Sequence, residues 1–152
     1  MSEYLTTAYD KFELRVRKGF YYTKDDLWVG IENGKAKVGV SDFLQKTSGD
    51  VAFIEVAKLG STVEKGKEFA TIESAKTTVT LLSPMSGRLD ETNGTLTEKP
   101  ELVNSDPYGE GWLVVITPHN LEDGQASLLS AEDYYKLMLE KLQSEHGRLE
   151  SR

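Results

Sequence analysis

The sequence contains no cysteine and only two histidines and four prolines among its 152 residues. The absence of cysteine excludes disulfides, thiol nucleophiles and thiolate metal sites, and it is compatible with a reducing compartment, so we expect a cytoplasmic protein. Neither His119 nor His146 has metal-ligand spacing to another histidine, so we predict no metal site. Phosphate-binding loops, dinucleotide fingerprints and serine elbows are also missing, and we predict no catalytic residue.

Excess positive charge and long apolar runs are lacking as well. Lysine and arginine number 18 against 25 aspartates and glutamates, and the formal net charge is −7. This balance argues against nucleic acid or an anionic membrane as a partner, and it allows docking to basic patches on other proteins. No stretch approaches the roughly 18 apolar residues of a transmembrane helix, and the N-terminus does not resemble a signal peptide. We expect a monomer without a membrane partner.

The hydrophobic pattern predicts many short strands and one substantial helix. Apolar and charged residues alternate with period two in several segments, which indicates strands with one buried face. Asn33-Gly34 is a strong signal for a hairpin turn. Apolar residues at helical spacing predict a helix over residues 131–144, and short helices are expected at 42–46 and 100–104. Strands are expected at residues 12–16, 27–31, 35–40, 51–56, 68–72, 77–82, 88–91 and 112–117.

This order of elements is typical of a β-sandwich or flattened barrel with a docked C-terminal helix. The length fits a single domain with terminal appendages. We divide the chain into an N-terminal extension at 1–19, with one strand and a frayed beginning at 1–10, a folded domain at 20–144, and a polar tail at 145–152.

Lys76 lies between two predicted strands, at the tip of a hairpin. Most exposed lysines only solvate the surface, so the position alone does not identify a function. The flanking strands would hold the backbone firmly while the primary amine projects into solvent, and Glu73 stands three residues before the lysine. This pattern resembles the attachment hairpin of lipoyl and biotin-carrier domains. The neighbours Ala75 and Thr77 are not methionines, which favours lipoate over biotin.

Further motifs resemble the H protein of the glycine cleavage system over about residues 20–142. They are Tyr22-Thr23, Trp28-Val29, Val38-Gly39-Val40-Ser41-Asp42, Gly49-Asp50-Val51, Glu73-Ser74-Ala75-Lys76, Ser83-Pro84-Met85-Ser86-Gly87 and Val103-Asn104-Ser105-Asp106-Pro107-Tyr108-Gly109-Glu110-Gly111-Trp112.

The resemblance implies a mainly β fold, the lipoyl/biotinyl-type hybrid barrel-sandwich with a C-terminal α-helix. It also implies a carrier that is not an enzyme, with lipoate covalently attached to Lys76. By the same resemblance, the hairpin residues recognised by a lipoate ligase or lipoyl transferase would be Glu73, Ser74, Ala75 and Thr77. The residues around the cofactor arm would be Asp26, Trp28, Val79 and Thr80.

Two departures from the family pattern bear on what the arm carries. The family usually has His-Glu-Trp where this chain has Asp26-Leu27-Trp28, and it has a carboxylate shortly after the lysine where this chain has threonines. Since the family's histidine lies near the loaded arm, its replacement favours a related branch, the H-like lipoate-binding proteins of sulfur oxidation. Those proteins work with a heterodisulfide-reductase-like complex and use the dithiol–disulfide couple.

Two alternatives remain open. The first is a genuine glycine cleavage H protein, which carries the aminomethyl group from glycine decarboxylase to aminomethyltransferase and is reoxidised by dihydrolipoamide dehydrogenase. The second is an interaction module that kept the fold without being lipoylated, which the intact Glu73–Lys76 hairpin disfavours. Trp28 and Trp112 could serve as ligand platforms, but we expect both to be buried or half-buried strand aromatics.

Overall fold

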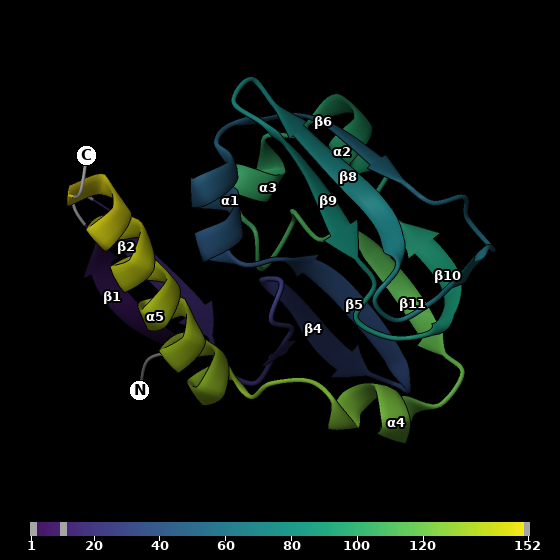
Figure 1. Ribbon diagram of the computed structural model, residues 1–152. Coiled ribbons are helices and arrows are strands. Elements are labelled where there is room, and N and C mark those ends of the chain that lie inside the picture. Colours follow the sequence, from purple (N-terminus) through teal and green to yellow (C-terminus); the bar gives the residue numbers. More distant parts are fainter. Residues whose placement is uncertain (1–2, 10–11, 151–152) are drawn as a thin grey trace.

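The computed structural model describes the backbone of residues 3–9 and 12–150 and the side chains of residues 3–8 and 13–144. Three antiparallel sheets are present, with the orders β3-β4-β5-β11-β10-β7, β6-β8-β9 and β1-β2 (Figure 1). The strands are β1 (Tyr4–Tyr9), β2 (Phe12–Arg17), β3 (Tyr21–Tyr22), β4 (Leu27–Glu32), β5 (Lys35–Val40), β6 (Val51–Val56), β7 (Thr62–Val63), β8 (Glu68–Ser74), β9 (Thr78–Leu82), β10 (Gly87–Thr92) and β11 (Val114–Pro118).

The two larger sheets contribute apolar side chains to one main core. Val38 and Ile116 enter it from the six-stranded sheet, and Ile72 enters it from the three-stranded sheet. β4 and β5 are joined at Asn33-Gly34, whose positive φ angles of 53° and 75° are those of a type I′ turn. The predicted mainly β, sandwich-like fold with a C-terminal helix is therefore confirmed.

The N-terminal segment differs from the prediction. The described residues of the range 1–19 form two strands, because β1 pairs with β2 over its whole length, from Tyr4↔Arg17 to Tyr9↔Phe12. The expectation that residues 1–10 are frayed is wrong for 4–9, whose threonines and tyrosines favour a strand. The resulting hairpin is a separate sheet and does not extend the core sheets.

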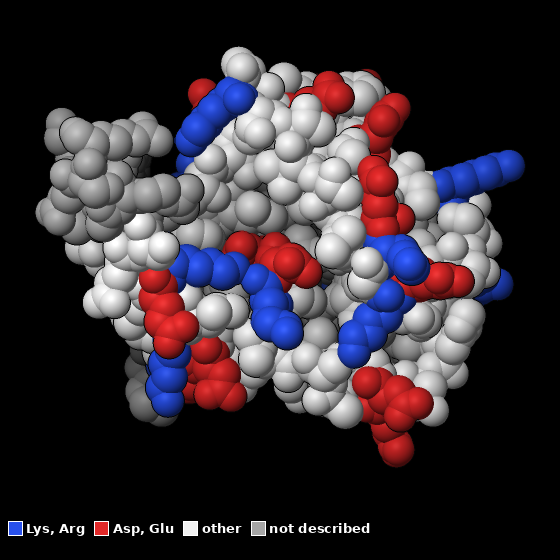
Figure 2. All heavy atoms as spheres, in the orientation of Figure 1, with Lys and Arg blue, Asp and Glu red and all other residues white. Residues whose placement is uncertain are grey.

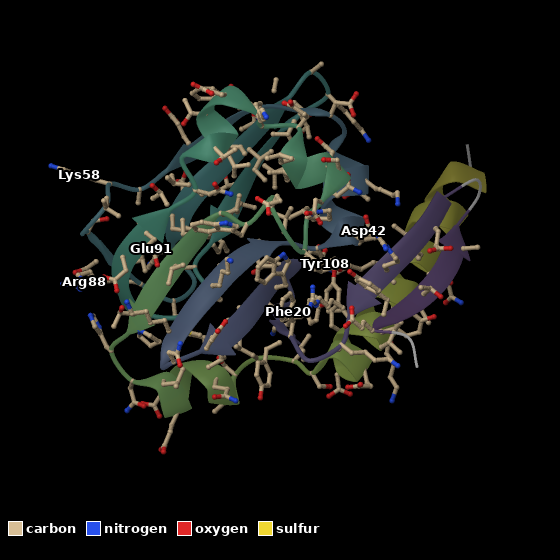
Figure 3. All side chains as sticks on the ribbon, turned by 180° about the vertical axis from the view of Figure 1, so that it is seen from behind. Phe20, Asp42, Lys58, Arg88, Glu91 and Tyr108 are labelled. Atoms are coloured by element: carbon tan, nitrogen blue, oxygen red, sulfur yellow. The ribbon has the colours of Figure 1, made fainter. Side chains whose placement is uncertain are left out.

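Side chains of the main domain satisfy the edge of β2 that faces away from β1. The Arg15 amide donates to Asp42 Oδ2 at 2.9 Å, and the Arg15 carbonyl accepts from the Tyr108 hydroxyl at 2.7 Å. Tyr108 also packs beside Phe20, with ring centroids 6.4 Å apart, and Figure 3 shows both rings where the hairpin meets the main domain. The hairpin is thus fixed to the domain without joining its sheets.

Five helices complete the described part of the chain: α1 (Asp42–Ser48), α2 (Thr95–Glu98), α3 (Leu102–Ser105), α4 (Leu121–Ala126) and α5 (Ala131–Glu150). α1, α3 and the start of α5 agree with the predicted helices. The sequence did not predict α2 or α4, and α2 begins directly after Asn93-Gly94. Among the described residues, no helix combines the length and the apolar character needed to cross a membrane.

The C-terminal helix α5 is longer than expected and has a core of its own. It begins at the predicted Ala131 but continues to Glu150, so residues 145–150 are helical rather than a tail; residues 151–152 lie outside the described part. Tyr134, Met138 and Leu142 pack in a second cluster with Leu14 of the β1-β2 hairpin. The ring of Tyr134 stacks on that of Tyr22 at 4.5 Å between centroids.

A buried carboxylate joins α5 to the main domain. Asp26 accepts from the Tyr134 hydroxyl at 2.7 Å and pairs with the Lys141 ammonium at 2.9 Å. Its φ of 72° is in the left-handed region, which aspartate tolerates better than most residues. Burial, and then the neighbouring Asp26 carboxylate, raise the pKa of Tyr134, so its hydroxyl remains a donor. Tyr134 also shares a hydrogen bond of 2.9 Å with Ser41 Oγ.

We predict that Asp26→Asn lowers the free energy of unfolding by about 1–2 kcal/mol, measured by urea denaturation. Asparagine tolerates the left-handed backbone but leaves the Lys141 ammonium without its carboxylate. The exposed neighbour Asp25 provides the control, and Asp25→Asn is expected to change the free energy by less than about 0.5 kcal/mol. Equal effects of the two substitutions would show that the Asp26–Lys141 pair does not stabilise the docking of α5.

Candidate functional site

Lys76 lies at the tip of the hairpin formed by β8 and β9, which projects from the body of the domain in Figure 1. The strands pair up to Glu73↔Thr78, and the Ser74 amide donates to the Thr77 carbonyl at 2.9 Å to close the turn. The Lys76 side chain is exposed. The sequence-based placement of this lysine between two strands is therefore confirmed.

The hydroxyl of Ser74 organises the turn. Its Oγ accepts from the backbone amides of Lys76 at 3.2 Å and Thr77 at 3.1 Å. It also donates to the Ser48 carbonyl at 2.7 Å, at the C-terminal end of α1. One side chain therefore shapes the turn and ties it to a neighbouring helix, which restricts the position of the Lys76 backbone.

The Lys76 side chain lies along the end of α1. Its Nζ donates to the Thr47 carbonyl at 3.0 Å, where the unpaired carbonyls of a helix C-terminus attract a cation. A β-carbon built at Gly49 would lie 3.7 Å from both Cβ and Cδ of Lys76, which is ordinary van der Waals contact. Gly49 itself has a φ of 83°, which explains why glycine follows the helix.

Asn104, from α3, clamps the segment that connects α1 to β6. Its Nδ2 donates to the Gly49 carbonyl at 3.0 Å and to Gln45 Oε1 at 3.1 Å. Its Oδ1 accepts from the Val51 amide at 2.8 Å. These bonds hold the segment against which the hairpin and the lysine side chain lie.

The Lys76 amine has a single hydrogen-bond partner in the described part of the chain. In the described part of the chain, Lys76 forms no ion pair, and no group of three or more histidine, aspartate or glutamate side chains could hold a metal ion. The amine contacts one backbone carbonyl, and the amide N–H formed by acylation could still donate to that oxygen. The site is therefore suited to carrying an attached group.

The structure brings together the residues predicted for recognition of the hairpin. Ala75 and Thr77 are exposed beside Lys76, and Glu73 is exposed one pair before the turn. Of the predicted arm surroundings, Thr80 is exposed, whereas Val79 is half-buried and packs against the main core. These two residues therefore point to opposite faces of β9.

Asp26 and Trp28 are also predicted to surround the arm, and that stays a prediction. The Ser41 amide donates to the Asp26 carbonyl at 2.9 Å, so Asp26 is at the N-terminal end of α1, and Lys76 is at the other end. Seven helical residues separate these ends by about 10 Å. Trp28 is fully buried and donates to the Pro107 carbonyl at 2.8 Å. The expectation of a strand aromatic in the core is confirmed for Trp28, and Trp112 is half-buried.

The site also uses residues that the sequence reading did not assign to it: Thr47, Gly49 and Asn104. Gly49 and Asn104 stand in two of the motifs that carry the family resemblance, which was the available signal. Thr47 contributes only its backbone carbonyl, so its side chain gave no signal.

An exposed lysine on a rigid hairpin, within a sandwich of short strands, defines an attachment domain of the carrier class. Comparison with known proteins is consistent with this class, because the model of the Glycine cleavage H-protein family matches residues 20–141. The chain belongs to the glycine cleavage H-protein family. Proteins of this family are non-catalytic carrier subunits with lipoate covalently attached to a lysine.

Individual relatives agree with the family match. The chain is 39% identical over 127 residues to a probable glycine cleavage system H protein of Pyrococcus abyssi, covering 83% of this chain and 94% of the relative. It is 44% identical over 113 residues to the glycine cleavage system H protein of Bacteroides fragilis, covering 74% and 89%.

A solved structure is also similar. It is the crystal structure of a glycine cleavage system H protein from Mycobacterium marinum, with a TM-score of 0.72 and 30% identity over 78% of this chain and 95% of that one. These findings support the lipoyl carrier. They give no support to the specialisation in sulfur oxidation or to the heterodisulfide-reductase-like partner that the sequence reading favoured.

We predict that Asn104→Ala lowers the free energy of unfolding by about 2–3 kcal/mol in urea denaturation, because it leaves the Gly49 carbonyl and the Val51 amide unpaired. Hydrogen exchange at the Val51 amide should accelerate more than exchange in the six-stranded sheet. Asn120 caps α4 away from the hairpin, so Asn120→Ala should cost at most about 1 kcal/mol and leave Val51 exchange unchanged. Unchanged Val51 protection in Asn104→Ala would contradict the clamp.

Proposed function

We propose that this chain is the H protein of a glycine cleavage system and that Lys76 is its lipoylated residue. In this role it carries the aminomethyl group from glycine decarboxylase to aminomethyltransferase, and dihydrolipoamide dehydrogenase reoxidises the arm. The observation that carries the proposal is the exposed Lys76 amine on a hairpin tied to α1. The names of its relatives support the choice of pathway.

The surroundings of Lys76 fit an attached acyl group. The side chain is exposed and passes beside Gly49, where even an added β-carbon would make only ordinary van der Waals contact with it. The amine has no carboxylate partner among the described residues, so acylation breaks no ion pair there. It removes one positive charge and takes the formal net charge from −7 to −8.

The contribution of the chain is to hold and present the amine. During attachment, the Lys76 ammonium loses one proton, and its Nζ then attacks a lipoate carboxyl carbon that a lipoate ligase has activated by transfer of AMP from ATP, with release of pyrophosphate. AMP and a second proton leave as the amide bond forms. Once bound, lipoate supplies a disulfide–dithiol couple. Ser74 and the paired strands β8 and β9 fix the Lys76 backbone, from which the lipoyl arm extends. Each docked partner enzyme therefore meets a high local concentration of the reactive end of the lipoyl arm.

The position of Asp26 bears on the choice of pathway. An aspartate in place of the family's histidine argues, on sequence alone, against an aminomethyl cargo. Its carboxylate is occupied by Tyr134 and Lys141, at the end of α1 away from Lys76. The packing of α5 thus gives a reason for this aspartate that is independent of the cargo, which supports the glycine cleavage reading over sulfur oxidation.

The attachment site is tested with Lys76→Arg. Incubation with a purified lipoate–protein ligase, ATP and lipoate should increase the intact mass of the unchanged protein by one lipoyl group and leave the mass of the variant unaltered. The free energy of unfolding of the variant should lie within about 0.5 kcal/mol of that of the unsubstituted protein, because an exposed side chain buries little surface. Lys65→Arg, an exposed lysine in another turn, should still be lipoylated. Full modification of Lys76→Arg would refute the assignment.

The pathway is tested by the exchange of labelled carbon dioxide into glycine in the presence of glycine decarboxylase. Lipoylated protein should support exchange at rates typical of an H protein, and Lys76→Arg should give the background rate. If the lipoylated protein also gives only the background rate, the glycine cleavage role is contradicted and a role in sulfur oxidation becomes the favoured hypothesis.

A further inference from the structure

The outer face of the three-stranded sheet adjoins the Lys76 hairpin. The strand pairing defines two rows of side chains on this face. One row consists of Phe53, Glu73 and Thr78, and the other consists of Glu55, Thr71 and Thr80. The row between them, Ile54, Ile72 and Val79, points the other way, into the main core. We refer to Phe53, Glu55, Thr71, Glu73, Thr78 and Thr80 as the outer face.

Phe53 is an unusual residue for this face. Its side chain is 50% exposed, and the only other exposed large hydrophobic residue in the described part of the chain is Leu59, at 57%. Directly paired residues have β-carbons about 5 Å apart, and strands rise about 3.3 Å per residue, so Phe53 lies about 10 Å from the Lys76 backbone. An exposed aromatic ring close to a modified residue is a candidate contact for a partner.

Unpaired acidic groups surround Phe53. Glu55 and Glu73 are exposed, and neither forms an ion pair among the described residues. Asp50 is exposed at the same end of the sheet, next to Gly49. The six residues of the outer face include no lysine or arginine. Figure 2 shows acidic side chains over the region where Figure 1 draws β6 and β8.

We propose that the outer face, centred on Phe53, is the docking site for the enzyme that attaches lipoate to Lys76. The partner surface that fits it is an apolar recess for the phenyl ring, bordered by basic side chains that face Glu55 and Glu73. The proposal rests on the proposed function, since it requires that Lys76 be the residue modified.

The outer face lies close to Lys76, which favours the attaching enzyme as its partner over the enzymes that act on the distal end of the arm. An attaching enzyme must hold the Lys76 amine itself at its reaction centre, so its contact area has to include residues within a few ångströms of the hairpin. Enzymes that act on the distal end of a long arm can reach it without touching the hairpin. A second copy of this chain is disfavoured, because a two-fold contact would bring the acidic groups of the outer face against themselves.

The test compares Phe53→Ala with Leu59→Ala, the other exposed hydrophobic residue, which lies beyond the end of β6 that is distant from the hairpin. Initial rates of lipoylation are measured by intact mass with a purified lipoate–protein ligase, ATP and lipoate, over a range of carrier concentrations. Phe53→Ala should raise KM by about tenfold with little change in kcat, and Leu59→Ala should behave as the unchanged protein.

A second comparison examines the charges. The double variant Glu55→Gln/Glu73→Gln should lower kcat/KM at low ionic strength and weaken its dependence on salt, because the steering charges are lost. Far-ultraviolet circular dichroism and urea denaturation establish that each variant is folded. We expect Phe53→Ala to change the stability little, since Phe53 is 50% exposed.

The outcomes separate this proposal from the proposed function. Lipoylation of Phe53→Ala with an unchanged kcat/KM, or an equal loss in Leu59→Ala, overturns the docking site while leaving Lys76 as the attachment residue. A defect of Phe53→Ala that is confined to the glycine decarboxylase exchange assay overturns the occupant proposed for the face. Failure of the unchanged protein to be lipoylated at Lys76 overturns both.

Discussion

The site depends on a helix that could not exist by itself. α1 has seven residues, fewer than an isolated helix needs to be stable in water. At its start, Ser41 Oγ accepts from the Leu44 amide and bonds to the Tyr134 hydroxyl of α5. At its end, the Thr47 and Ser48 carbonyls accept from the Lys76 and Ser74 side chains. The carrier hairpin and the C-terminal helix therefore attach to opposite ends of the same short element.

The parts of the structure that the sequence predicts are those whose determinants are local. The alternation in β8 and β9 indicates two strands, and the break between them places Lys76 at a tip. Asn33-Gly34 specifies its own turn through two positive φ angles. Helical spacing locates the start of α5 at Ala131, but polar composition gave too early an end, because polar residues do not by themselves stop a helix and α5 continues through Gly147 to Glu150.

The parts that the sequence does not predict depend on partners far along the chain. Asp26 meets side chains 108 and 115 residues later, and no periodicity signals that encounter. Asn104 reaches Gly49 across 55 residues. The strand β1 has few large apolar residues, and it forms because β2 and α5 provide its pairing and packing. For Asp26 and Asn104 tertiary contacts decide the outcome and the local pattern gives no signal, whereas in β1 they add to a local preference for a strand.

The bonds of Ser74 have a consequence for how another protein can recognise the tip. Within the turn, the amides of Ser74, Lys76 and Thr77 all donate to acceptors inside the turn itself. A visiting protein therefore cannot use these three donors to extend a sheet onto the tip, as proteins that bind exposed strand edges do. At these three positions a partner has side chains to recognise in place of free amides. Single substitutions of exposed side chains can therefore change recognition of this lysine without altering the bonds that shape the turn.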